Sequence, residues 1–201
     1  RKFYKDVLRE IGTFLMRSMP RAVGSIKNKL SQAVRVRIMS APEYGAIAGG
    51  TTSGELGISD GASRLNAIID RWAESVSVRF IKGSGKSLGL IDIGILQEDW
   101  EDVLSMAEAE LTYSSKRGTK TLPWLRWLLK EGSATIVSQY DFIPSPRGSR
   151  TGFGIMVKRR GGWKVPAQLA GTEKDNFATR ALDDIATDIN TIVRREITRV
   201  I

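Results

Sequence analysis

Two groups of acidic residues could supply the paired carboxylates that acid–base catalysis or Mg²⁺ binding requires. Both groups fall in stretches with helical periodicity, at positions that face outward. We therefore expect solvated helix charges, with a carboxylate site as the less favoured alternative. The groups are Glu98, Asp99, Glu101 and Asp102, and Asp183, Asp184 and Asp188.

The rest of the usual catalytic chemistry is absent from the sequence. The chain of 201 residues has no cysteine and no histidine, which excludes thiol nucleophiles, thiolate zinc sites and imidazole bases. Gly85-Lys86-Ser87 matches the end of a phosphate-binding loop, but Phe80 stands where the loop needs its first glycine, and a strand pattern follows in place of a helix. We predict no enzymatic activity, no cofactor and no metal site.

Basic residues are the stronger signal for function, because the formal net charge is +9. This charge predicts either an anionic partner or a soluble basic surface. A loop, Ile143–Arg150, precedes a predicted strand, Thr151–Val157, and a basic turn, Lys158–Gly162, follows it. Because the loop and the turn lie at opposite ends of this strand, their basic residues need not form one patch. They could contact phosphates, meet acidic patches of a partner subunit, or be solvated turns. The candidate interaction residues are Arg147, Arg150, Lys158, Arg159, Arg160 and Trp163.

The first 75 residues are predicted to be helical. One helix is expected over Lys2–Met19 and a second from Pro20, since proline suits the first turn of a helix. A short helix around Pro42–Ala48 is followed by a glycine-rich loop, and Asp60 caps a third helix. The second helix has a basic face that could bind nucleic acid or an acidic protein, although a solvated face is the commoner reading. Its residues are Arg21, Lys27, Lys29, Arg35 and Arg37.

From Val76 the apolar period changes to that of strands. A hairpin is expected around the Gly83–Lys86 linker, with further strands at Glu108–Tyr113, Thr135–Phe142 and Phe153–Val157. The predicted fold class is α+β: a mainly antiparallel sheet of four to five strands with N-terminal helices and a long C-terminal helix. Three segments are expected between the strands. They are a short helix, Glu98–Ser105, with Trp100 and Leu104 inward, a polar loop, Lys116–Lys120, and a compact helix in LPWLRWLLKEG. The expected organisation is a helical region, 1–75, and an α+β core, 76–201, as one structural unit.

A long amphipathic helix closes the chain. Its apolar positions recur at steps of three and four residues, which places them on one stripe. Asp175 or Asn176 can cap its start. About 26 residues would make a rod of about 39 Å. The stripe consists of Phe177, Ala181, Leu182, Ile185, Ile189, Ile192, Val193, Ile197 and Val200.

Phrases in the last third resemble neck and tail-completion proteins of tailed bacteriophages, a group that includes tail terminators, minor tail proteins and head–tail joining proteins. The phrases are LPWLRWLLKEG, SRTGFGIMV, GGWKVPAQLAGT and DNFATRALDDIATDINTIVRREI, and SAPEYGAIAGGTTSGELGI is similar to the opening of such virion proteins. A proline followed by N-F and R-A-L before the final helix is common in that group. The matching residues are Pro166, Asn176, Phe177, Arg180, Ala181 and Leu182.

The resemblance implies a structural protein of the virion neck, assembled in the bacterial cytoplasm. Its expected partners are copies of itself in a ring, six-fold in many members, together with connector or adaptor and tail-tube proteins. Basic residues facing the lumen would tolerate passing DNA, and no membrane is involved. The alternative from the charge alone is a basic nucleic-acid-binding module without catalysis.

Overall fold

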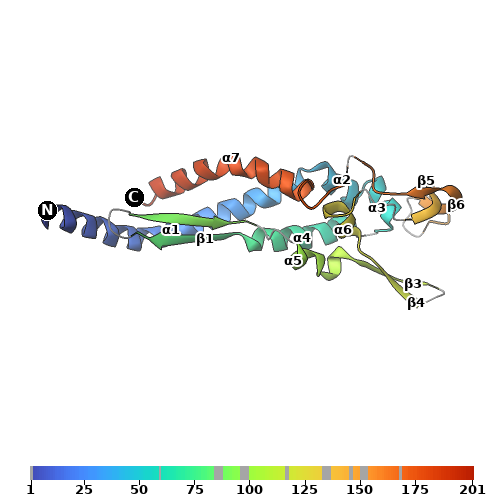
Figure 1. Cartoon of the computed structure of the whole chain (residues 1–201), viewed down its shortest axis with the longest axis horizontal. Coiled ribbons are helices and arrows are strands. Elements are labelled where there is room, and N and C mark those ends of the chain that lie inside the picture. Colours follow the sequence, from blue (N-terminus) through green and yellow to red (C-terminus); the bar gives the residue numbers. More distant parts are fainter. Residues whose placement is uncertain are drawn as a thin grey trace.

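A computed structural model describes residues 2–58, 60–83, 88–95, 100–115, 118–132, 137–144, 147–149, 154–167 and 169–201. The molecule is elongated, with both termini toward one end and two hairpins at the other (Figure 1). Helices α1 and α7 and the hairpin β1–β2 lie along the first part of the long axis, and the shorter helices lie between them and the distal hairpins. The chain is α+β with a long C-terminal helix, as the sequence predicts.

Helix α1, Lys2–Met39, runs through Pro20 without a break, so the prediction of two helices is wrong. The buried stripe simply continues across the proline, from Met19 to Ala22 and Ile26. Pro20 itself lies on the exposed side, where water can satisfy the Met16 carbonyl that proline leaves without an N–H donor. A shared apolar face therefore outweighs the local preference of proline for a helix start.

Three further helices follow. Helix α2, Pro42–Ala48, has the predicted bounds, but α3, Thr51–Leu56, occupies much of the predicted glycine-rich loop. Helix α4, Gly61–Ser75, is the predicted third helix, and its apolar face of Leu65, Ile68, Ile69 and Trp72 is buried. Asp60 stands at the N-cap position without a side-chain capping bond, because its carboxylate pairs with Arg64, 2.7 Å away.

In the described part of the chain, the strands form three separate antiparallel hairpins instead of the predicted sheet of four to five strands. The first pairs β1, Ser77–Lys82, with β2, Gly89–Gly94, and confirms the predicted hairpin, whose linker residues 84–87 are outside the described part. The second hairpin pairs β3, Leu111–Ser115, with β4, Gly118–Leu122. Strand β3 overlaps the predicted strand Glu108–Tyr113, and β4 occupies much of the predicted polar loop Lys116–Lys120. The third hairpin pairs β5, Val137–Pro144, with β6, Gly154–Trp163.

The hairpins remain apart because short buried helices separate them along the chain. Helix α5, Glu101–Leu104, and the 3₁₀ turn η1, Ala107–Ala109, lie between β2 and β3. Helix α6, Trp124–Leu129, lies between β4 and β5, with Trp124 fully buried as predicted for a core position. Trp100 precedes α5 in the left-handed region, at φ 61°, and its side chain is buried. Burial of the indole offsets the roughly 1–2 kcal/mol cost of that backbone conformation.

Helix α7, Phe177–Thr198, has a strong N-terminal cap. The Asn176 side chain accepts hydrogen bonds from the backbone N–H groups of Ala178 and Thr179, each at 3.0 Å, and the Thr179 hydroxyl accepts one from the Asn176 N–H. This reciprocal pair is a capping box. The prediction of Asn176 as a cap is thus confirmed, while the regular helix is shorter than the 26 residues expected.

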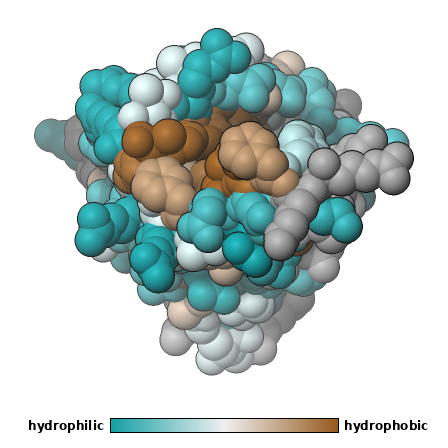
Figure 2. Space-filling view, turned by 90° about the vertical axis from the view of Figure 1, so that its left-hand side faces the viewer, coloured by the Kyte–Doolittle hydropathy of each residue, from teal (hydrophilic) through white to brown (hydrophobic). Residues whose placement is uncertain are grey.

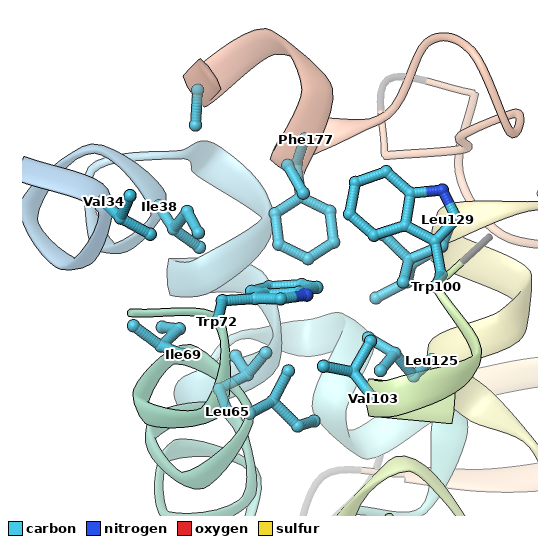
Figure 3. Packing of buried hydrophobic residues seen from close by; sticks show 14 of the residues in the cluster. Val34, Ile38, Leu65, Ile69, Trp72, Trp100, Val103, Leu125, Leu129 and Phe177 are labelled. Carbon is cyan, nitrogen blue, oxygen red and sulfur yellow. The ribbon is translucent and has the colours of Figure 1, made fainter. Parts of the chain in front are cut away.

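The hydrophobic core centres on Trp72 of α4 (Figure 3). Its ring meets those of Trp100 and Phe177 edge to face, with centroids 6.0 and 5.8 Å away. Helices α1, α4, α5, α6 and α7 all contribute to this core, which therefore draws on residues both before and after position 76. Labelled members in Figure 3 are Val34, Ile38, Leu65, Ile69, Val103, Leu125 and Leu129.

Candidate interaction surfaces

The predicted candidate residues that the structure describes lie in the third hairpin or its loop. Arg147 is exposed in a turn after β5, and Arg150 is outside the described residues. Lys158, Arg159 and Arg160 lie within β6, so the predicted basic turn Lys158–Gly162 is wrong. Trp163 is the last residue of that strand. The described candidates thus belong to one structural unit at the end of the molecule farthest from the termini (Figure 1).

An irregularity in the hairpin explains why these residues resemble a turn. The pairing passes from Tyr140 opposite Lys158 to Ser138 opposite Gly162. Three residues, Arg159–Gly161, therefore face the single residue Gln139, which is a bulge in β6. Glycines favour bulges as well as turns, and the spacing in the sequence does not distinguish them. Bulges also interrupt the regular edge of a strand.

The basic positions are spread along the hairpin. Lys158 is four residues beyond Gly154, where the strand leaves the loop, which corresponds to about 13 Å at roughly 3.3 Å per residue. Arg147 lies on the loop side of Gly154. The two groups are thus separated along the strand, in agreement with the expectation that they need not form a single patch.

The predicted basic face of α1 is only partly free. Arg35 forms an ion pair with Asp70 of α4, and Arg37 forms one with Asp188 of α7 at 3.0 Å. These two arginines connect neighbouring helices, which is a structural role. Arg21 is exposed and carries no such pair within the described part of the chain, and Lys27 and Lys29 are likewise exposed.

A second basic surface lies on the last turns of α7. Arg194, Arg195 and Arg199 lie together along a shallow face. Arg199 donates to Glu196 at 2.9 Å, which reduces its free charge. Neutral threonines separate the basic side chains on this face, so any anion would meet scattered positive charges.

Glu196 is a buried carboxylate that the sequence analysis missed. Its Oε2 accepts a hydrogen bond of 2.6 Å from the Ser25 hydroxyl of α1, and the side chain is 4 % exposed. The hydrogen bond from Ser25, opposed by burial and aided by Arg199, lowers the pKa of Glu196 below its ordinary value. Its position between Val193 and Ile197 on the apolar stripe is the signal that could have identified it.

A second buried carboxylate gives a structural role to Arg180, one of the residues that match the phrase before the final helix. Glu43 of α2 is 2 % exposed, and its Oε1 accepts from Arg180 Nη2 at 2.5 Å. Arg180 also donates to Asp175 at 2.7 Å. Burial lowers the pKa of the Arg180 guanidinium, but the hydrogen bonds and charges of Asp175 and Glu43 together raise it. Asn176, Phe177 and Arg180 thus secure the start of α7 to the core.

The acidic groups among the described residues do not gather into a metal-binding cluster. Asp183 and Asp184 are exposed, and no group of three or more acidic side chains there could hold a metal ion. Glu98 and Asp99 are outside the described residues. Glu101 lies 3.5 Å from Lys130, a structural contact between α5 and the end of α6. None of the described helices is long and apolar enough to span a bilayer.

An exposed apolar surface at the other end of the molecule is the largest feature that the sequence analysis missed. Figure 2 shows hydrophobic side chains gathered at this end, surrounded by hydrophilic ones. The first four turns of α1 expose several large apolar residues, and the adjacent hairpin β1–β2 adds more. The exposed residues are Phe3, Tyr4, Val7, Ile11, Phe14, Met16, Ile81, Leu88 and Leu90.

Comparison with protein-family models, with curated proteins and with solved structures finds no match to this chain.

Proposed function

We propose that the chain is a structural virion protein of a tailed bacteriophage, forming a ring at the neck that completes the tail and joins it to the head. One observation carries the proposal. The chain is built as an elongated helical body with separate two-stranded hairpins, of which β3–β4 and β5–β6 lie at its far end (Figure 1). Within the described residues, each hairpin leaves both outer edges unpaired with other strands of the same chain.

Unpaired strand edges are suited to contacts between subunits. An edge presents N–H and C=O groups that a strand of a neighbouring chain can complete. The hairpins β3–β4 and β5–β6 lie far from the helical end, so a contact between one hairpin and a different surface of the next copy would be heterologous. Contacts of that kind form rings when the rotation closes. The proposed partners are therefore further copies of the chain, with connector and tail-tube proteins above and below the ring.

The third hairpin is the proposed contact with either DNA or a partner. Its basic positions, including Arg147 in the loop and Lys158 in β6, would face a lumen or an acidic neighbour. Contacts with phosphates from scattered positive charges need no base preference. The chain itself would turn over no substrate.

The alternative function is a basic nucleic-acid-binding module. The net charge of +9 and the arginines on the last turns of α7 favour it. This alternative predicts a monomer whose affinity for DNA falls steeply with salt, since each neutralised phosphate releases counterions.

The experiment that separates the two functions measures the particle and its DNA affinity together. Purified full-length chain is examined by light scattering, by negative-stain electron microscopy, and by fluorescence anisotropy with a labelled DNA duplex at several salt concentrations. Closed rings with a central opening support the neck protein. A monomer that binds DNA with a steep salt dependence supports the alternative. A monomer that does neither, at concentrations on the order of 100-fold above a micromolar Kd, contradicts the ring.

A further inference from the structure

The first half of α1 has an apolar stripe that the rest of the described chain leaves exposed. Tyr4, Val7, Ile11 and Phe14 follow one another at steps of three, four and three residues, which places them on one side of the helix. Tyr4 is 59 % exposed and Phe14 46 % exposed. Phe3, beside the stripe, is 82 % exposed. Isolated exposed apolar residues are common in proteins, but a continuous stripe of this length indicates a partner.

The stripe continues the path that α7 covers farther along α1. From Phe14, steps of four, four and three residues lead to Ser18, Ala22 and Ser25, and Ser25 hydrogen bonds to Glu196 of α7. Arg37, near the end of α1, pairs with Asp188, near the middle of α7, so the two helices run antiparallel. Helix α7 ends alongside the middle of α1, and the strip beyond that point lacks a covering helix (Figure 1).

The opposite side of the same segment is already occupied. Lys82, Gly83 and Leu88 of the first hairpin line a groove with Leu8 and Gly12 of α1. The hairpin therefore covers the first half of α1 on one flank, as α7 covers the second half on the other. The flank that carries Ile11 and Phe14 remains exposed among the described residues and is open to a further helix.

We propose that the same segment of a second copy of this chain packs antiparallel on this stripe, with a two-fold axis near Gly12 and Thr13. In this register Ile11 of each copy lies against Phe14 of the other, in the alternating layers of an antiparallel helix pair. The partner helix would then occupy, along the first half of α1, the place that α7 occupies along the second half. This pairing does not rest on the proposed neck function.

Charges beside the stripe favour this register. Glu10 and Arg17 are exposed and lie seven residues apart on the same edge of the stripe. In the antiparallel pair, Glu10 of each copy meets Arg17 of the other, so two ion pairs form across the axis. Within one copy, Glu10 lies 4.0 Å from Arg9. A parallel pair would give neither Glu10 nor Arg17 a partner of opposite sign across the interface and would place the two α7 helices side by side. Antiparallel packing directs the two bodies away from each other.

The exposed area is sufficient for a moderate dimer. Phe3, Tyr4 and Phe14 together expose roughly 400 Å² per copy, taking ~200 Å² for each aromatic side chain. Val7 and Ile11 bring the area buried by both copies to about 1,000 Å², at the lower limit for a specific interface. We expect a dissociation constant on the order of micromolar.

A charge exchange tests the contact by sedimentation equilibrium of the full chain. Glu10→Arg and Arg17→Glu, made singly, each place like charges together twice and should weaken association at least tenfold. The double variant Glu10→Arg, Arg17→Glu restores opposite pairs and should recover most of the wild-type affinity. Both positions are exposed, so the fold is unaffected, and circular dichroism checks this. A wild-type chain that stays monomeric overturns the proposal, as do variants that associate like the wild type.

Cross-linking tests the direction of the pair, because the chain has no cysteine of its own. Ile11→Cys and Phe14→Cys are produced separately and oxidised alone or mixed. The antiparallel register predicts covalent dimers chiefly in the mixture. Equal cross-linking of each variant with itself indicates a parallel pair and contradicts the proposal. Closed rings that ignore the charge exchange would also contradict it, while leaving the proposed neck function intact.

Discussion

The ion pair between Glu43 and Arg180 allows a quantitative test of what secures α7 to the core. Glu43 is 2 % exposed and has one oxygen, Oε2, without a hydrogen-bond partner among the described groups. The carboxylate therefore depends on Arg180 for compensation of its charge. Removing that partner leaves a buried charge unpaired, which in fully buried pairs costs about 3–5 kcal/mol.

The expected cost is smaller here because the Arg180 side chain is 45 % exposed and solvent screens part of the interaction. We expect Arg180→Met to lower the free energy of unfolding by about 2–3 kcal/mol. Glu43→Gln removes the charge but keeps the shape, and should cost about 1–2 kcal/mol. In the double variant Glu43→Gln, Arg180→Met, the neutral amide of Gln does not need the guanidinium that has been removed. The two costs in unfolding free energy should therefore not add, and the coupling energy between the two positions should be about 1–2 kcal/mol.

Urea unfolding followed by tryptophan fluorescence measures these energies, since Trp72 lies in the same core. Asp175→Asn is the matched control. It removes the other carboxylate bound to Arg180, but Asp175 is 74 % exposed, so its loss should cost less than about 1 kcal/mol. A coupling energy between Glu43 and Arg180 indistinguishable from zero would refute the view that this pair compensates a buried charge.

Three other predictions concern stability and are checked by urea or thermal unfolding. Asn176→Ala removes a cap that is fully buried, and should cost about 2 kcal/mol; a loss under about 0.5 kcal/mol would contradict the capping role. Gly171→Ala places a Cβ against the Leu128 carbonyl and should cost more than 1 kcal/mol, whereas Gly24→Ala, with open space in mid-helix, should stabilise by up to about 1 kcal/mol; equal effects would contradict this packing. The folded-state pKa of Glu196 is lowered from its ordinary value of 4.5, so the stability that its carboxylate contributes is complete above pH 4.5 and is lost as the pH falls through the lowered folded-state pKa. Glu196→Gln should therefore reduce the acid sensitivity of unfolding, and an unchanged pH profile would contradict the linkage.

The helices were largely predictable because their buried residues repeat at the helical period. Leu65, Ile68, Ile69 and Trp72 lie on one face in the sequence and are all buried in α4. Phe177 and Asn176 were likewise assigned correctly at the start of α7. Periodicity reports which face of a helix is apolar, and the core then uses that face.

The arrangement of the strands was not predictable from the same patterns. Alternation identifies a strand such as β5, but it carries no information about which strand pairs with it beyond a local hairpin. The buried α5 and α6 separate the three hairpins, and that depends on how Trp100 and Trp124 pack in the core. The turn predicted at Lys158–Gly162 is a bulge for a similar reason, since the shift in register between Ser138 and Tyr140 depends on how β5 and β6 pair.

The candidate surfaces show the same limit. Basic residues could be recognised individually, but only the structure shows that Arg35 and Arg37 are engaged in ion pairs between helices. Conversely, Ile11 and Phe14 have the spacing of core residues, and their exposure depends on where α7 ends. An apolar stripe is buried only where another element covers it, and the residues of the stripe do not determine how long that covering element is.

The antiparallel contact between α1 and α7 has a consequence during synthesis on the ribosome. Ser25 and Glu196 are 171 residues apart, so α1 emerges long before the helix that covers it. At about 5–20 residues per second, the interval is roughly 10–30 s. Throughout that time the apolar face of the nascent helix is open to chaperones and to neighbouring nascent chains. Ribosome profiling of chaperone binding should therefore show occupancy that begins once α1 has left the exit tunnel and persists until α7 follows.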